Sequence, residues 1–135
     1  MSFSNDLQVF NKRTLKKAKV VKRRSTLDLF SSIVMGTPVF KGVLRNNWFA
    51  TIGAPSSETT ANGDKGGNAT IGRIRSAIAN ADLRQDILLT NNLPYAVPIE
   101  FDGHSHKAPQ GMVRVNTLRW DDIVAVNIRK AQNVR

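Results

Sequence analysis

The sequence predicts an α+β domain, in which a long N-terminal helix and a C-terminal helix pack on a small, mainly antiparallel β-sheet with a long mobile loop. Three observations lead to this fold class. Apolar residues recur at helical spacing near both ends of the chain, short strand-like runs lie between them, and residues 54–69 hold no large apolar side chain. A length of 135 residues fits one domain, residues 1–135, made of a helical arm (1–35) and a body (36–135).

The composition is that of a folded protein held by packing alone. Hydrophobic residues make up 41% of the chain and charged residues 22%. No apolar run approaches the length of a membrane span, and the N-terminus lacks the apolar core and cleavage site of a secretory signal. The chain contains no cysteine, which excludes disulfides and thiolate metal ligands. We therefore expect the protein in a reducing cytosol or in a virion.

Residues 4–35 are predicted to form the long helix. Ser4 or Asn5 can cap it, and Asp6 in the first turn interacts favourably with the helix dipole. Residues 26–35 carry the better apolar stripe and should pack on the body, so residues 12–24 would project as a basic arm. This window contains no acid and supplies most of the net charge of +10, through Lys12, Arg13, Lys16, Lys17, Lys19, Lys22, Arg23 and Arg24. Such a block fits either a solvated helical face or contact with DNA or an acidic partner.

The next stretch stops the long helix and starts new elements. Gly36 suits a left-handed C-terminal cap, Thr37 an N-cap and Pro38 the first position of a second helix. A strand is predicted over residues 47–53, where large and small side chains alternate. The mobile loop, residues 54–69, includes a Lys-Gly-Gly run but lacks the Gly-Lys-Ser/Thr ending of a phosphate-binding loop, so nucleotide binding is not expected.

The second half of the chain alternates between helix and strand signals. Residues 70–83 are predicted to be helical, with one apolar face formed by Ile71, Ile74, Ala77, Ile78 and Ala81. Strands are predicted at 86–91 and at 95–101, the latter restricted to an edge or irregular strand by Pro94 and Pro98. A C-terminal helix is predicted at 114–129, with a strand over 112–117 as the alternative, and residues 130–135 should be a polar, frayed tail.

Individual side chains are expected to have structural roles. Trp48 and Trp120 are the largest apolar groups and should lie in the core. Tyr95 can bury its ring while its hydroxyl reaches a partner. Glu100 and Arg114 are expected to form a charge-assisted pair, within one chain or between two subunits. The edge strand containing Glu100 would offer its unpaired backbone to a neighbouring subunit.

The residue patterns do not predict an enzyme, a cofactor or a metal site. His104 and His106 flank Ser105 in a glycine-flanked loop, but the chain has no other histidine and no cysteine to complete a zinc site. Asp121 and Asp122 are adjacent, so on a helix they diverge by about a hundred degrees and cannot flank one substrate bond. The chain also lacks a Gly-x-Ser-x-Gly turn for a nucleophilic serine.

Two segments resemble small structural proteins of tailed bacteriophages, the neck or tail-completion group also described as minor tail proteins. Residues 37–48 carry Thr-Pro-Val, a glycine and Leu-Arg-x-x-Trp, although Phe40-Lys41 stands where Asp-Thr is common. Residues 91–114 carry Asn-Asn-x-x-Tyr-Ala, then Glu-aromatic-Gly-x-Ser with Asp102 inserted, then Ala-Pro-x-Gly-Met-Val-Arg. The signature residues expected at a subunit interface are Tyr95, Glu100, Phe101, Pro109, Gly111, Met112 and Arg114.

The resemblance implies a homo-oligomeric ring at the phage neck or the upper end of the tail, with DNA passing through its lumen. The partners would be adjacent neck and tail proteins, and the protein would be found in the virion, or in the host cytoplasm during assembly. A closed ring uses heterologous contacts, which suits a small subunit with a protruding arm. Two alternatives stay open. One is a free, basic, architectural nucleic-acid-binding protein, which no recognisable DNA- or RNA-binding motif supports; the other is a tail-terminator ring.

Overall fold

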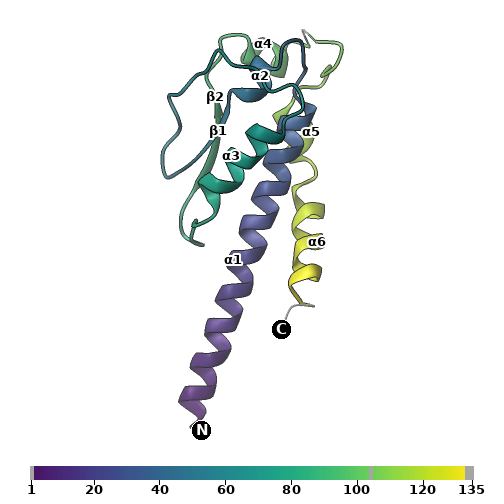
Figure 1. The fold of residues 1–135 in the computed structure, drawn as a ribbon. Helices are drawn as coiled ribbons and strands as arrows, with labels where there is room; N and C mark the ends of the chain where they lie inside the picture. The colour runs from purple at the N-terminus through teal and green to yellow at the C-terminus, as the bar shows by residue number, and fades with distance from the viewer. Residues whose placement is uncertain (1, 104, 133–135) are drawn as a thin grey trace.

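The computed structural model of the chain describes residues 2–103 and 105–132. It confirms the α+β class, with a long N-terminal helix, a C-terminal helix beside it and a small antiparallel sheet (Figure 1). The elements in chain order are α1 (Phe3–Gly36), α2 (Val43–Asn46), β1 (Trp48–Ile52), α3 (Asn68–Ile78), β2 (Ile87–Asn91), α4 (Ala96–Phe101), α5 (Val113–Thr117) and α6 (Trp120–Gln132). The C-terminal half of α1 runs through the body, and its N-terminal half extends away from it (Figure 1).

The two ends of α1 are capped differently from the prediction. Ser2, not Ser4 or Asn5, is the N-cap, because its hydroxyl accepts a hydrogen bond from the backbone N–H of Asn5 at 3.3 Å. At the other end Gly36 stays within the helix and does not adopt a left-handed conformation. Thr37 ends the helix: its backbone is extended, and its hydroxyl donates to the Ile33 carbonyl at 2.7 Å.

The predicted second helix beginning at Pro38 is wrong. The chain runs without helix from Pro38 to Gly42, and the four-residue α2 begins at Val43. Gly42 has a φ of 80°, so the chain turns into α2 through a left-handed residue. A Cβ at this position would lie 2.6 Å from the backbone nitrogen of Lys65, so the close approach of the 54–69 loop also requires glycine.

The sheet has two strands where three were predicted. β1 and β2 pair antiparallel, with Trp48 opposite Asn91 and Ile52 opposite Ile87, in agreement with the predicted strands at 47–53 and 86–91. The predicted edge strand at 95–101 is wrong, because this segment forms α4. Pro98 is the third residue of α4, where a backbone N–H has no partner within the helix, so the proline is accommodated. This segment therefore offers no strand edge to a neighbouring subunit.

The core lies between the C-terminal half of α1 and the elements packed against it. Its buried apolar residues are Phe30, Ile33, Val34, Leu44, Trp48, Ile74, Ala96, Ala108 and Met112. Trp48 is 5% exposed and donates its indole N–H to the Thr37 hydroxyl at 2.8 Å, so its predicted core position is confirmed. Trp120 is 38% exposed, and its predicted burial is wrong. It starts α6 at the rim of a surface hollow that Leu29 and Ile87 also line.

α3 covers the sheet side of the core and is shorter than the predicted helix at 70–83. Ile74 and Ile78 are buried as predicted, whereas Ala77 is exposed and Ala81 is buried in the turn beyond the helix. Arg73 joins α3 to the sheet. It donates to the backbone carbonyl of Trp48 at 2.8 Å, and its guanidinium lies 4.2 Å from the centroid of the Phe49 ring.

The predicted C-terminal helix at 114–129 is divided into two helices, and the alternative strand at 112–117 is wrong. α5 ends at Thr117, and α6 begins at Trp120 and packs along α1 (Figure 1). α6 continues to Gln132 with Ala131 buried, so residues 130–132 are not the frayed tail that was predicted. Residues 133–135 lie outside the described residues. Within the described chain, no helix has the length and apolarity needed to cross a bilayer.

Candidate functional site

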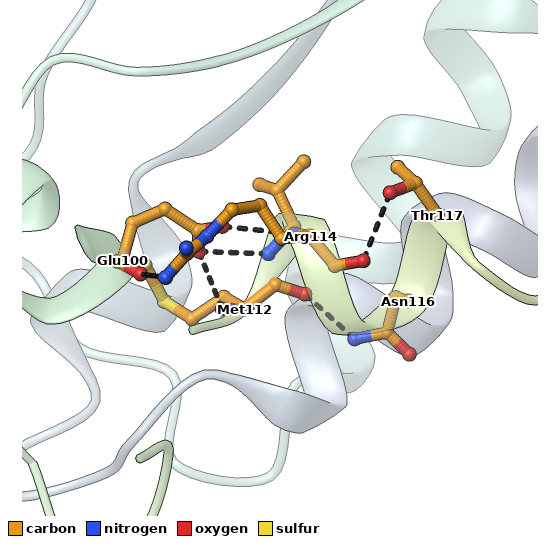
Figure 2. Close-up of polar contacts among 6 residues, drawn as sticks. Glu100, Met112, Arg114, Asn116 and Thr117 are labelled. Carbon is orange, nitrogen blue, oxygen red and sulfur yellow. Dashed lines mark hydrogen bonds and ion pairs between the residues drawn. The ribbon is translucent and has the colours of Figure 1, made fainter. Parts of the chain in front are cut away.

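Glu100 and Arg114 form the predicted pair within one chain, at the start of α5. Arg114 Nε lies 3.3 Å from Glu100 Oε1, and the Arg114 guanidinium also donates to the Glu100 backbone carbonyl (Figure 2). The Glu100 carboxylate accepts the backbone N–H groups of Met112, Val113 and Arg114, the last two at 2.9 Å and 2.8 Å. These are first-turn donors without a partner inside the helix, so a glutamate from α4 caps α5.

The ionised form of Glu100 is favoured although the side chain is only 7% exposed. Burial alone raises the pKa of this carboxyl, but the backbone hydrogen bonds from Arg114, Val113 and Met112 and the Arg114 side chain outweigh burial. The pKa of Glu100 therefore lies below its ordinary value. The hydrogen bonds that cap α5 therefore favour the carboxylate as an anion.

Gly111 allows this arrangement to form. Its φ is 90°, and a Cβ built on it would lie 2.6 Å from the Glu100 carbonyl oxygen and 2.7 Å from Glu100 Oε2. An alanine at this position would meet both a strained backbone and the capping carboxylate. The sequence pattern identified Gly111, Glu100 and Arg114 together, but the capping role of Glu100 was not predicted. The available signal was that α5 begins at Val113 with Met112 at its N-cap position, where serine, threonine, aspartate or asparagine is preferred.

The signature residues divide into an inner and an outer group. Glu100, Gly111 and Met112 are buried within the chain, so they cannot lie at a subunit interface as predicted. Arg114 pairs with Glu100 inside the chain and also stacks over Phe101, with its guanidinium carbon 4.9 Å from the ring centroid. Tyr95, Phe101 and Pro109 are exposed. Tyr95 therefore does not bury its ring in this chain, and the outer group is the part that a neighbour can contact.

The first signature segment is joined to the end of α1 and to the second segment. Arg45, which is buried, donates to the backbone carbonyls of Met35 and Thr37 at 2.9 Å and of Lys65 at 2.7 Å. A cation at these carbonyls complements the negative end of the helix dipole. Asn91 donates its amide to the Leu44 carbonyl at 3.0 Å. The two segments that carry the resemblance are therefore in direct contact in the fold.

The two segments also line a shared surface hollow of about 550 Å³. Its apolar wall includes Val39, Leu44 and Ile99, and Phe40 and Tyr95 stand at its edge. Lys41 and Lys107 also line the hollow and make its surroundings basic.

The loop at 54–69 contains no helix or strand before Asn68, as predicted, but several side chains bind it to the body. Asn47 bonds both backbone groups of Thr60, and Asn92 donates to the Ser56 carbonyl at 2.8 Å. Asp64 caps α3, accepting from the Gly67 and Thr70 backbone N–H groups at 3.2 Å and 2.7 Å. Since this carboxylate already occupies the N-terminus of α3, a phosphate group would compete with it there.

The eight cations of the predicted basic arm divide between the body and solvent. Lys19 lies 3.2 Å from Asp82, Lys22 donates to the carbonyls of Asp82 and Leu83, and Arg23 donates to the Ala81 carbonyl at 2.8 Å. These three hold the turn between α3 and β2 against α1, so the prediction that they project is wrong. Lys12, Arg13, Lys16, Lys17 and Arg24 are exposed.

The part of α1 beyond the body also exposes apolar side chains. All residues from 4 to 17, here called the projecting segment, are exposed, and this half of α1 stands clear of the other elements (Figure 1). Phe10 is 64% exposed, and Leu7 and Leu15 are each about half exposed. The projecting segment therefore combines apolar groups with four cations, Lys12, Arg13, Lys16 and Lys17.

Among the described residues, no group of three or more histidine, aspartate or glutamate side chains is placed to hold a metal ion. His106 is exposed in its loop, and His104 lies outside the described residues.

Comparison of the chain with protein-family models, with curated proteins and with solved structures finds no match.

Proposed function

We propose that the chain is a structural protein of a tailed bacteriophage, which forms a ring at the neck where head and tail join and through which DNA passes. Its action is mechanical. The body provides a fixed shape that repeats around the ring, and the projecting segment makes contacts beyond its own subunit. Under this proposal the protein needs no cofactor and catalyses no reaction.

The observation that carries the proposal is the role of the signature residues in the fold. Arg45 binds the end of α1, Trp48 fixes Thr37, Asn91 holds α2, and Glu100 caps α5. These polar groups are committed to internal hydrogen bonds, and none of the four side chains lines the hollow that the two segments share. A signature that specifies the shape of the body is what a repeating subunit requires, whereas a catalytic signature would present its polar groups to a substrate.

The projecting segment supports an assembly role through its chemistry. An isolated subunit leaves Leu7 and Phe10 in water, on the part of α1 that extends beyond the body. Exposed apolar groups of this size on a rigid element are typical of a surface that is covered in the working assembly.

The test is the native mass of the purified full-length chain together with negative-stain imaging. We expect closed rings of one size. A chain that stays monomeric at all concentrations, with or without its neighbouring virion proteins, would contradict the proposal. In an infection, a phage that carries Lys12→Gln, Arg13→Gln, Lys16→Gln and Lys17→Gln should accumulate unjoined heads and tails, while the subunit still folds, since these four side chains are exposed on the projecting segment.

A free nucleic-acid-binding protein is the second candidate, because Lys12, Arg13, Lys16, Lys17 and Arg24 are exposed on one helix. A dedicated DNA binder should hold one site at least roughly a thousandfold more tightly than bulk DNA at physiological salt. A gel-shift titration of specific against random duplexes decides between the candidates. A strong preference for one site would favour this alternative over the neck ring.

A further inference from the structure

The stripe of α1 that packs against α6 continues beyond the end of α6. Asn127 of α6 donates to Ser25 and Asp28 at 3.2 Å and 2.9 Å, and Arg119 donates to Ser32 at 3.3 Å. Steps of three or four residues from Ser25 towards the N-terminus lead through Val21, Ala18, Thr14, Phe10 and Leu7, which therefore lie on the same face. α6 ends at Gln132, beside the middle of α1, so the projecting segment has this face uncovered (Figure 1).

A groove with complementary character lies between α1 and α6 of the same fold. It has a volume of about 450 Å³, and Ile123 and Val126 of α6 supply its apolar groups. Its charged lining consists of two carboxylates, Asp28 of α1 and Asp122 of α6, and one guanidinium, that of Arg119. The Arg119 guanidinium already donates to Ser32, so the groove keeps a net negative charge. The projecting segment has an apolar stripe flanked by lysine and arginine, and it matches a groove with apolar groups in which two carboxylates outnumber one guanidinium.

The projecting segment cannot reach the groove of its own chain. α1 is a single helix of 34 residues, about 50 Å long, and the groove is built on its far half. Folding back would require breaking the helix between Lys17 and Asp28, where Lys19, Lys22 and Arg23 hold it against the body. The groove that receives the segment must therefore belong to another molecule.

Two other occupants of this face fit less well. Two projecting segments packed against each other in antiparallel orientation would bring Lys12, Arg13, Lys16 and Lys17 of both copies together, and like charges would repel. Duplex DNA would neutralise these cations but would leave Leu7 and Phe10 without apolar contact, since phosphate contacts involve charge and polar groups. The groove with Asp28 and Asp122 satisfies both the charge and the apolar stripe.

We propose that the projecting segment of one subunit lies in the α1–α6 groove of a second copy of this chain, with Phe10 against Ile123 and Val126 and its cations facing Asp28 and Asp122. This inference rests on the proposed ring function, and it identifies the contact that joins neighbouring subunits. Each copy carries one segment and one groove, so the contact is heterologous and can repeat around a closed ring.

The first test uses the absence of native cysteine. Phe10→Cys and Val126→Cys are made in separate chains, both at exposed positions, and the two proteins are mixed under mild oxidation. We expect a disulfide-linked heterodimer that forms in the mixture at least about tenfold faster than in a matched mixture of Val9→Cys and Val126→Cys. Val9 is exposed but lies off the stripe, because it is one position removed from Phe10 on the helix. Equal rates for the two mixtures would overturn the proposal.

The second test compares two adjacent carboxylates of α6. Asp122 lines the groove and Asp121 does not, although both are exposed in the first turn of α6. Asp122→Lys should weaken subunit association about tenfold or more, and Asp121→Lys about twofold or less, because only the first places a cation opposite the incoming lysines. Sedimentation velocity over a concentration series measures both effects.

The outcomes separate this inference from the proposed function. If the unmodified chain forms rings and Asp122→Lys associates as strongly as Asp121→Lys, the groove contact is wrong and the ring stands. If the unmodified chain is monomeric throughout, both are wrong. A third outcome is that the cysteine pair does not cross-link, that the chain retards duplex DNA in a gel, and that Phe10 and Leu7 stay exposed. Duplex DNA is then the occupant, and the groove contact is wrong.

Discussion

The carboxylate of Glu100 holds the second signature segment together, and its protonation state determines whether it can do so. Its pKa is below the ordinary value of 4.5, because its hydrogen bonds outweigh burial. A group with a lowered folded-state pKa stabilises the fold above its unfolded-state pKa, and this contribution is lost as the pH falls through the folded-state pKa. The pH window for the loss therefore begins near 4.5 and extends downward.

Glu100→Gln should remove this contribution while keeping the shape of the side chain. At neutral pH the variant should lose about 1.5–3 kcal/mol in the free energy of unfolding, the range for hydrogen bonds to a charged group. The difference between the two proteins should shrink as the pH is lowered below about 4.5, because the native carboxylate is then protonated too. Urea unfolding at neutral pH and at low pH measures it. A difference that stays constant over this range would contradict the assigned role.

Gly111 and Gly53 make a matched pair for separating backbone strain from steric conflict. Both have a φ near 90°, but a Cβ on Gly53 meets nothing within 4 Å, whereas one on Gly111 meets the Glu100 carbonyl and carboxylate. Gly53→Ala should cost only the strain of a left-handed residue, about 1–2 kcal/mol. Gly111→Ala should cost at least about 2 kcal/mol more, because Glu100 must move away from α5. Equal costs for both in chemical denaturation would show that the cap tolerates a methyl group.

The two tryptophans should differ in the same type of experiment. Trp48 is 5% exposed and donates a hydrogen bond to Thr37, so Trp48→Ala should cost about 3–5 kcal/mol. Trp120 is 38% exposed, so Trp120→Ala should cost about 1–2 kcal/mol at most. Urea unfolding curves measure the loss in the free energy of unfolding for each variant. Comparable losses would mean that Trp120 contributes to the core more than its exposure indicates.

At the scale of elements, the sequence predicted the helices and strands whose apolar residues recur at a clear helical or strand spacing. α1, β1 and β2 lie close to their predicted ranges, because their apolar periods are clear and their ends are marked. α4 was predicted as a strand because a run of six residues with apolar character fits either structure, and Pro98 was interpreted as a sign of an edge strand. The break between α5 and α6 was not predicted, and both helices pack against α1.

Those features of the candidate site that follow from the types of residue alone could be predicted from the sequence. The pairing of Glu100 with Arg114 was predicted, and so was the exposure of four cations in the projecting segment. The bonds of Lys22 and Arg23 to carbonyls between Ala81 and Leu83 join residues about sixty positions apart, so their role in the body could not be inferred from a charge block alone. The caps formed by Asp64 and Glu100 were missed for a different reason: each carboxylate belongs to a residue that precedes the N-cap position, where the rules for capping residues do not apply.

Mobility of the loop at 54–69 stays a prediction, and Asp64 is the loop side chain that binds the start of α3. The Asp64 carboxylate accepts three hydrogen bonds, from Gly67 and from the backbone and side chain of Thr70. Asp64→Ala should leave the start of α3 uncapped, at a cost of about 1 kcal/mol, and free the loop preceding it. Limited proteolysis followed by mass analysis should then cut within 54–69 several times faster, while Asp86→Ala serves as an exposed control. Unchanged cleavage would show that Asn47 and Asn92 are sufficient to hold the loop.

At the scale of the whole molecule, the charge of +10 is divided between cations that stabilise the body and cations that face solvent. Lys22 and Arg23 are bonded to backbone carbonyls, so their charge is used within the fold. The four cations of the projecting segment are instead exposed to solvent, and they lie on the part of α1 that extends away from the body (Figure 1). They are Lys12, Arg13, Lys16 and Lys17. Binding of the chain to DNA should therefore be driven by phosphate neutralisation at the projecting segment, with little dependence on sequence.

The salt dependence of DNA binding tests this division quantitatively. Each cation that neutralises a phosphate of duplex DNA contributes roughly 0.9 to the slope of log affinity against log salt concentration. Changing Lys12, Arg13, Lys16 and Lys17 to glutamine should therefore reduce the magnitude of that slope by roughly 3 to 4, without a loss in the free energy of unfolding. Lys22→Gln should leave the slope almost unchanged and instead destabilise the fold, because its ammonium group holds the turn between α3 and β2. Fluorescence anisotropy with a random duplex at several salt concentrations, paired with urea unfolding of each variant, measures both quantities. A slope that falls as much for Lys22→Gln as for the exposed lysines would mean that the cations of the body also face the nucleic acid.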